Sequence, residues 1–261
     1  MRFALNHIVT PNLPLADFFA LAGNLGLSEV EIRNDLPDVV GTTAPETVKA
    51  EAERAGVTLL SINALYPFNS WSEELQEKTL ALTDYAAASG AKALVMCPLN
   101  DGTKVPFDDL VAALRAIKPI LDARGITGLV EPLGFPISSL RTKKEAISAI
   151  IAAGGGDTFR LVHDTFHHHL AGETDFFPEW TEIVHISGVT DPSIGVAAML
   201  DGHRVLVDEA DRLNNIAQIR ALHASGFEGP YSYEPFAPEI HALLEPVQSL
   251  RASMAHIVGA I

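Results

Sequence analysis

Short apolar runs alternate with longer amphipathic segments along almost the whole chain. The short runs are rich in β-branched and aliphatic residues, which favour strands, and they cover residues 3–8, 29–33, 58–63, 93–97, 126–131, 160–164, 183–187 and 231–234. Between them apolar residues recur at helical spacing, which predicts helices over residues 15–25, 45–55, 72–89, 106–123, 143–153, 211–225 and 238–258.

The alternation of strands and helices predicts an α/β fold with parallel strands joined by right-handed crossovers. Eight such units in about 250 residues have the size of a closed (β/α)8 TIM barrel, so we expect a single domain over residues 1–261. An open doubly wound sheet is the alternative. Its usual Gly-x-Gly-x-x-Gly turn is missing, because the first strand leads into His7-Ile-Val-Thr-Pro11. The longest connection, residues 188–211, would cover the active face of a barrel as a lid.

Composition and charge narrow the functional classes. With 48% hydrophobic and 20% charged residues, the chain can bury a full core. A net charge of -15 argues against binding to nucleic acid or to anionic membranes and leaves small polar substrates open. The single Cys97 cannot form an internal disulfide, and no run of about 18 apolar residues suggests a membrane span. We therefore expect a cytoplasmic protein.

Four side chains that commonly bind metals fall at or near the carboxyl ends of the last four predicted strands. They are Glu131, Asp164, His185 and Glu234. Because side chains alternate along a strand, each shares a face with the residue two positions earlier, and each would point inward at the rim of a barrel. One acidic residue at a strand end usually caps a helix or lies on the surface. Metal-binding residue types at the ends of four successive strands are much less expected by chance, and they indicate a shared site.

Three carboxylates at one rim would repel one another unless a positive charge lay between them. We therefore expect one divalent metal ion. Three oxygen ligands and one imidazole suit Mn²⁺, Mg²⁺, Co²⁺ or Zn²⁺, with substrate or water completing the coordination.

With these residues in place, the chain resembles the xylose-isomerase-like barrel superfamily, and within it the 2-keto-myo-inositol (inosose) isomerases of inositol catabolism. The similar segments are Phe3-Ala-Leu-Asn6, Val30-Glu-Ile-Arg33, Ser61-Ile-Asn63, Glu131-Pro-Leu-Gly-Phe-Pro, His163-Asp-Thr-Phe-His167 and Val184-His-Ile.

The resemblance implies that Glu131, Asp164, His185 and Glu234 are the metal ligands and that His167 is a histidine on the substrate side. It also implies that Arg204 holds substrate hydroxyl groups, although this chain has Val205-Leu-Val-Asp-Glu where a Pro-Gly-x-Gly turn is common in the family. From their places at the ends of the first three strands, we expect three further residues to line the pocket: Asn6, Arg33 and Asn63.

The implied reaction on a small polyhydroxy ketone moves a carbonyl group by proton transfer between adjacent carbons. Glu131 and Glu234 are the expected acid and base, because a carboxylate can contact the metal with one oxygen and reach a carbon-bound proton with the other. His167 would steady the developing oxyanion or move a hydroxyl proton.

Three other functions remain open. A ketose 3-epimerase uses the same ligands. An apurinic-endonuclease-like hydrolase holds three zinc ions, and Asp201-Gly-His203 resembles its Asp-x-His pair, but the third and fourth strands end in Asn63 and Cys97 rather than in further histidines. A non-catalytic sugar-binding barrel would keep the pocket without the proton transfer.

Association of barrels through their outer helices is common, so a homo-oligomer is also open.

Overall fold

Eight parallel strands close into one barrel, in the order of the sequence. The structure is a computed structural model and describes residues 1–37 and 39–261. The strands are β1 Arg2–Asn6, β2 Glu29–Arg33, β3 Thr58–Leu65, β4 Ala93–Met96, β5 Thr127–Val130, β6 Phe159–Asp164, β7 Thr181–Ile186 and β8 Pro230–Tyr233. β8 pairs with β1 through Phe3 opposite Tyr231, which closes the barrel. The predicted (β/α)8 TIM barrel is confirmed, and the alternative prediction of an open doubly wound sheet is wrong.

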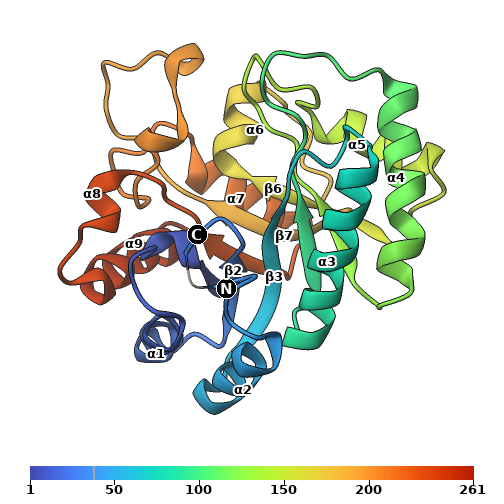
Figure 1. Cartoon of the computed structure of the whole chain (residues 1–261). Coiled ribbons are helices and arrows are strands. Elements are labelled where there is room, and N and C mark those ends of the chain that lie inside the picture. Colours follow the sequence, from blue (N-terminus) through green and yellow to red (C-terminus); the bar gives the residue numbers. More distant parts are fainter. Residues whose placement is uncertain (38) are drawn as a thin grey trace.

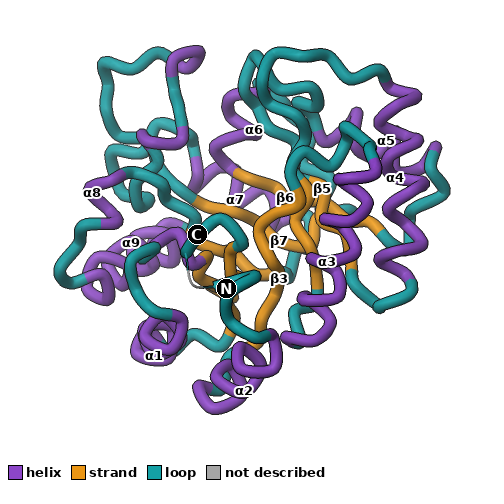
Figure 2. The backbone as a smooth tube through the Cα atoms, in the orientation of Figure 1, coloured by secondary structure: helices purple, strands orange, loops and turns teal. Residues whose placement is uncertain are grey.

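Helices surround the strands on the outside of the barrel (Figure 1). They are α1 Leu15–Leu25, α2 Pro45–Ala55, α3 Glu73–Ser89, α4 Phe107–Asp122, α5 Lys143–Ala152, α6 Thr165–Ala171, α7 Asn215–Ala224, α8 Pro238–His241 and α9 Pro246–Ala260, with short 3-10 turns at His7–Val9, Val196–Ala198 and Asp201–His203. Figure 2 shows the strands enclosed at the centre by these helices. No helix of the described residues combines the length and the apolar character needed to cross a bilayer.

The structure differs from the prediction at one predicted helix and at one helix that was not predicted, for local reasons. The helix expected over 238–258 is two helices, α8 and α9, because Pro246 begins a new helix and lacks the amide hydrogen that would continue the first one. A helix after β6 was not predicted. This helix, α6, has only seven residues, too few for an amphipathic repeat to show.

The barrel interior is filled by small and branched apolar side chains. Ala93, Val95, Leu129, Val162 and Ile183 form one buried cluster there. Leu129, Val162 and Ile183 each lie two residues before a predicted metal ligand, so alternation along the strand brings the ligand to the same inner face. The apolar layer thus forms the floor beneath the polar groups at the carboxyl end of the barrel.

Candidate metal centre

The four predicted ligands converge at the carboxyl end of the barrel. One ligand atom from each of Glu131, Asp164, His185 and Glu234 can be chosen so that all four lie within 4.8 Å of one another, and all four residues are buried. Their strand positions differ slightly from the prediction. Asp164 ends β6, His185 is the penultimate residue of β7, and Glu131 and Glu234 directly follow β5 and β8.

His185 lies between carboxylates on both edges of its ring. Its Nδ1 is 3.1 Å from Glu131 Oε1 and 3.2 Å from Glu234 Oε2. Its Nε2 is 3.1 Å from Oε1 of Glu31, on β2. Burial alone would lower the pKa of His185, but the charges of Glu234, Glu31 and Glu131 outweigh burial and raise this pKa well above its usual value.

Glu234 is held by donors from three other parts of the chain. Its Oε1 accepts from Asn6 Nδ2 at 3.1 Å and from Arg33 Nη1 at 3.0 Å, and its Oε2 accepts from Arg204 Nη2 at 3.0 Å. Burial would raise the pKa of Glu234, but His185 and the two guanidinium groups lower it overall. Glu234 is therefore fixed as a carboxylate in one orientation.

The carboxylate of Asp164 caps a helix and also pairs with a guanidinium group. Its Oδ1 accepts from the amides of Phe166 and His167, at 2.7 and 3.2 Å, and so caps the N-terminus of α6. Its Oδ2 accepts from Arg204 Nη2 at 2.6 Å. This cap sets the direction of α6 and places His167, which follows three residues later, beside the cluster.

His167 is buried against Phe135 and Phe166, whose rings meet its ring edge to face. No hydrogen-bond partner for its Nδ1 exists among the described residues. The same helix also lines a small cavity of about 10 Å³ that Asp164 and His167 share with Lys143 and Glu173.

Arg204 comes from the long connection between β7 and α7 and is only 1% exposed. Its guanidinium lies 5.0 Å from the ring centre of Phe166 and 4.8 Å from that of Phe236. Its Nε donates to Ser187 Oγ at 2.9 Å. The connection folds back on itself, since Gly188 and Val205 pair through their backbones, and this turn carries Arg204 into the cluster. The orange segment near residue 200 projects from the barrel in Figure 1.

Arg33 and Asn63 also lie at the carboxyl end, but with partners of their own. Arg33 Nε and Nη2 donate to Asp35 at 2.8 and 2.7 Å, in addition to the bond to Glu234. Asn63 Nδ2 donates to Glu31 Oε2 at 3.0 Å and contacts Ser61 Oγ at 2.9 Å. The structure thus brings all the residues that were expected to line the pocket into one hydrogen-bonded network with the predicted ligands.

Two residues of this network were not assigned to the site from the sequence. Glu31 is fully buried in contact with His185. The signal was present, because Glu31 lies two residues before Arg33 and alternation places both on the inner face. Cys97 packs against two apolar clusters, as a small buried residue commonly does, and its thiol also donates to Glu131 Oε2 at 3.3 Å. Burial and the charge of Glu131 raise the pKa of this thiol well above its usual value.

The cluster carries more negative than positive charge. Four buried carboxylates, Glu31, Glu131, Asp164 and Glu234, face two buried guanidinium groups, Arg33 and Arg204. With His185 neutral, as an imidazole that binds a metal is, the excess of two negative charges equals the charge of one divalent ion. Three carboxylates and an imidazole edge within 4.8 Å of one another are also suitable donors for such an ion, so the residues present fit a divalent metal.

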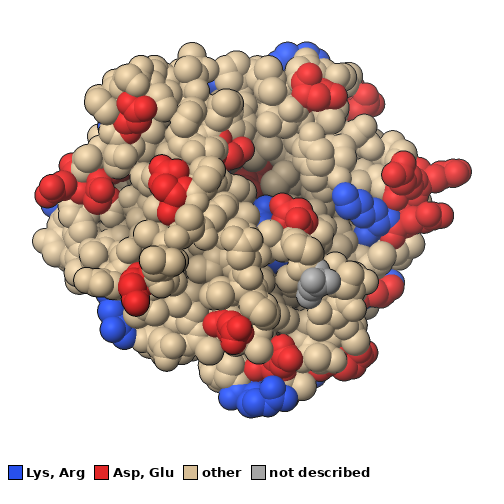
Figure 3. Space-filling view, turned by 60° about the vertical axis from the view of Figure 1, so that its left-hand side comes forward, with Lys and Arg blue, Asp and Glu red and all other residues tan. Residues whose placement is uncertain are grey.

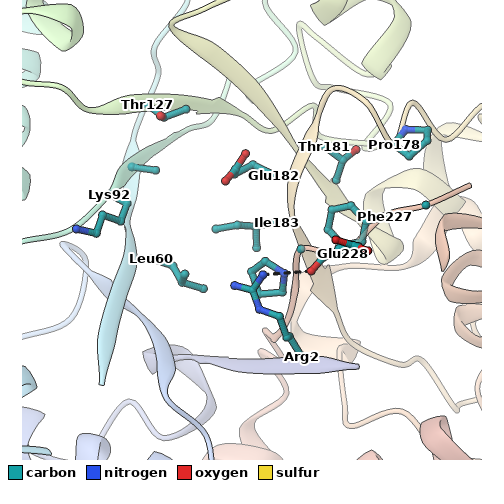
Figure 4. Close-up of a pocket in the computed structure, with 14 residues that line it drawn as sticks. Arg2, Leu60, Lys92, Thr127, Pro178, Thr181, Glu182, Ile183, Phe227 and Glu228 are labelled. Atoms are coloured by element: carbon teal, nitrogen blue, oxygen red, sulfur yellow. Dashed lines mark hydrogen bonds between the residues drawn. The ribbon is translucent and has the colours of Figure 1, made fainter. Parts of the chain in front are cut away.

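In the space-filling view the surface is hollowed, and red acidic and blue basic atoms are visible inside the hollow (Figure 3). A second hollow, of about 380 Å³, opens at the amino end of the strands and is lined by Leu60 and Ile183 among mixed charged groups (Figure 4). There Arg2 donates to the carbonyl oxygen of Glu228 at 3.1 Å. None of the four candidate ligands lines this hollow, and barrel enzymes work at the opposite end.

Comparison with known proteins supports the fold and the family. The model of the xylose isomerase-like TIM barrel family matches residues 19–258. A xylose isomerase domain-containing protein from Salmonella typhimurium LT2 is 37% identical with a TM-score of 0.93, and the match covers 98% of this chain and 97% of that one. No curated protein matches the chain.

Two more distant structures share the fold. The IolI protein with a bound zinc atom is 23% identical with a TM-score of 0.87, over 99% of this chain and 98% of that one. D-psicose 3-epimerase from Clostridium cellulolyticum H10, solved with D-tagatose, is 14% identical with a TM-score of 0.75, over 100% of this chain and 99% of that one. From the family match and the Salmonella relative, the chain belongs to the xylose isomerase-like TIM barrel family.

Proposed function

We propose that this protein is a metal-dependent isomerase that shifts the carbonyl group of a keto-inositol or a ketose by proton transfer through an enediolate. The observation that carries the proposal is the pair of carboxylates beside one imidazole edge. Glu131 Oε1 and Glu234 Oε2 lie 3.1 and 3.2 Å from His185 Nδ1. Two carboxylates at one point can remove a proton from one carbon and return it to the next.

One divalent ion would be held by Glu131, Asp164, His185 and Glu234, and when bound it would polarise the substrate carbonyl and stabilise negative charge on the neighbouring oxygen. The protein supplies the proton transfers. Of Glu131 and Glu234, one takes the carbon-bound proton as the base and releases it to solvent, and the other takes up a proton from solvent and delivers it as the acid to the neighbouring carbon. His167, at the start of α6, moves the hydroxyl proton or steadies the oxyanion.

Substrate hydroxyl groups are the proposed partners of Asn6, Arg33, Asn63 and Arg204. An uncharged substrate agrees with the charges around them. Arg33 already pairs with Asp35 and Glu234, and Arg204 with Asp164 and Glu234. A phosphate or carboxylate group on the substrate would find neither guanidinium unpaired and would add negative charge to an anionic cluster. A neutral polyhydroxy ketone such as an inosose meets no such penalty, and it agrees with the resemblance to the inosose isomerases of inositol catabolism.

A ketose 3-epimerase is the second candidate. The same pair of carboxylates favours it, because epimerisation also needs one group to take a proton and another to return one. The two reactions differ in which carbon is reprotonated, so their products distinguish them.

The proposal is tested with metal-loaded protein in D2O, incubated with inososes and a panel of neutral ketoses and followed by NMR. We expect isomerised product, with deuterium incorporated at the carbon next to the carbonyl. Glu131→Gln and Glu234→Gln should each reduce this exchange at least about 100-fold, the range that general acid–base groups contribute.

A matched control is Glu29→Gln, since Glu29 is a partly buried carboxylate that pairs with Arg2 at the amino end of the barrel, away from the four candidate ligands. Exchange at the wild-type rate in both active-site variants would remove these carboxylates as acid and base. Exchange with only a changed configuration at one carbon would identify the epimerase.

A further inference from the structure

Glu31 is the fourth carboxylate of the cluster, but it lies on the opposite edge of the histidine ring from Glu131 and Glu234. His185 Nδ1 faces Glu131 and Glu234, whereas His185 Nε2 lies 3.1 and 3.2 Å from the two carboxylate oxygens of Glu31. Glu31 is absent from the group whose atoms meet within 4.8 Å. Its place is therefore behind the histidine.

Glu31 is itself held rigidly by the next strand. Ser61 Oγ and Asn63 Nδ2, both on β3, donate to its Oε2 at 2.5 and 3.0 Å. Glu31 lies opposite Ser61 in the strand register, and Glu31 and Ser61 are fully buried. Two donors from a neighbouring strand leave the carboxylate little freedom to rotate.

This arrangement decides which ring nitrogen can bind a metal. A neutral imidazole carries its proton on one nitrogen and a lone pair on the other. A carboxylate that accepts the Nε2 proton leaves the lone pair on Nδ1, directed at Glu131 and Glu234. Carboxylate partners of this kind orient histidine ligands and strengthen their binding in many metal sites.

We infer that Glu31 is a positioning residue that fixes the tautomer and the ring orientation of His185 for a divalent cation, with Ser61 and Asn63 as its supports. The inference rests on the metal site in the proposed function. It does not depend on which substrate the protein transforms.

The test measures zinc binding to chelator-treated protein without any substrate, by competition with a chromogenic chelator. Glu31→Gln keeps the size of the side chain but removes its charge, and we expect zinc affinity to fall about 10- to 100-fold. Glu31→Asp keeps the charge but is shorter by one methylene group, so we expect an intermediate loss. Glu29→Gln is the matched control and should bind zinc with wild-type affinity, because Glu29 pairs with Arg2 at the amino end of the barrel.

A second readout separates positioning from a general loss of stability. In zinc-loaded wild-type protein labelled with ¹⁵N-histidine, we expect His185 to show a protonated Nε2 and a metal-bound Nδ1. In Glu31→Gln we expect this signature to be lost or broadened, while circular dichroism shows a folded barrel. If Glu31→Gln does not fold, Glu31→Asp carries both measurements.

The outcomes are distinct. Wild-type zinc affinity and an unchanged His185 spectrum in folded Glu31 variants would overturn the role of Glu31 and leave the proposed function standing. A wild-type protein that binds no zinc would overturn both. Reduced zinc affinity in the Glu31 variants, together with no turnover of any ketone, would support the role of Glu31 and contradict the isomerase.

Discussion

Arg204 contributes more polar contacts to the cluster than its position in a long loop would suggest. Its guanidinium contacts Asp164, Glu234 and Ser187 and lies near the rings of Phe166 and Phe236. A planar fork can make these contacts together, whereas the ammonium group of lysine is a point charge. The side chain therefore joins the ends of β6, β7 and β8 in one place.

We expect Arg204→Lys to lower the free energy of unfolding of the metal-free protein by about 2 kcal/mol, the scale of a hydrogen bond to a charged group. Urea denaturation measures the change. Arg212→Lys is the control, because Arg212 lies in the same connection and donates to backbone carbonyl groups instead of to the cluster. Equal effects of the two substitutions would contradict a special role for Arg204.

At this scale the sequence predicted that Glu131, Asp164, His185 and Glu234 lie together, which the structure shows, but not all of the residues that contact them. Ligands at strand ends follow from alternation along single strands. The contact between Glu31 and His185 joins β2 to β7, residues 154 positions apart, and depends on the closed barrel and its register. The residue type of Cys97 suggests packing, which the structure shows, but only the geometry reveals that the thiol also lies beside Glu131.

At the scale of secondary-structure elements, helix α6 packs closely against the loop after β5, and the position of the helix depends on this contact. A Cβ atom added to Gly134 would lie 2.2 Å from the carbonyl oxygen of His167 and 2.8 Å from Leu170 Cβ. Backbone atoms cannot move aside as a flexible side chain can. Gly134 thus allows the loop that follows Glu131 to pack directly against the helix that carries His167.

We therefore expect Gly134→Ala to displace α6 and to destabilise the protein by about 1–3 kcal/mol, the usual cost of overpacking, with reduced turnover through His167. Thermal unfolding and the proton-exchange assay measure the two effects. Gly195→Ala is the control, because a Cβ atom there would meet nothing within 4 Å. Wild-type stability and turnover in Gly134→Ala would show that the loop and the helix are not tightly coupled.

Element boundaries were the weaker part of the prediction, for physical reasons. The periodic segments gave most helices to within a few residues, as in α1 and α2. The short α6 is fixed mainly by the cap from Asp164 and by tertiary packing, and neither leaves a repeat in the sequence. Strand ends were misplaced by one or two residues because pairing with neighbouring strands decides where a strand stops.

For the whole molecule, the closed barrel followed from the count and order of strands alone. That the chain forms a single domain remains a prediction, and its association into a homo-oligomer remains open. The dependence of stability on pH is a further property of the whole molecule. It arises because buried histidines are neutral in the folded protein but take up protons in the unfolded chain.

His7 illustrates this dependence. It is fully buried, contacts the carbonyl oxygen of Leu13 through Nε2 at 3.0 Å and stacks on Phe18. Burial lowers its pKa to about 4. As the pH falls, the unfolded chain therefore binds a proton first, and the stability that is complete above about pH 6.5 is lost as the pH falls toward the folded pKa.

Urea denaturation at pH 7 and pH 5 gives the loss of unfolding free energy between the two pH values. We expect this loss to be about 2 kcal/mol smaller in His7→Gln than in the wild type. Histidines elsewhere, His168 among them, contribute to both proteins alike and cancel in the difference. An identical loss in the two proteins would mean that His7 titrates in the folded state as it does in the unfolded chain.

The central claim is that Glu131, Asp164, His185 and Glu234 bind one divalent ion, and calorimetric titration of zinc into chelator-treated protein tests it most directly. We expect saturable binding of about one ion per chain, as for a single-metal isomerase, and its loss in Asp164→Asn. No saturable binding by the wild type, or about three ions per chain as in a trinuclear hydrolase, would contradict the account.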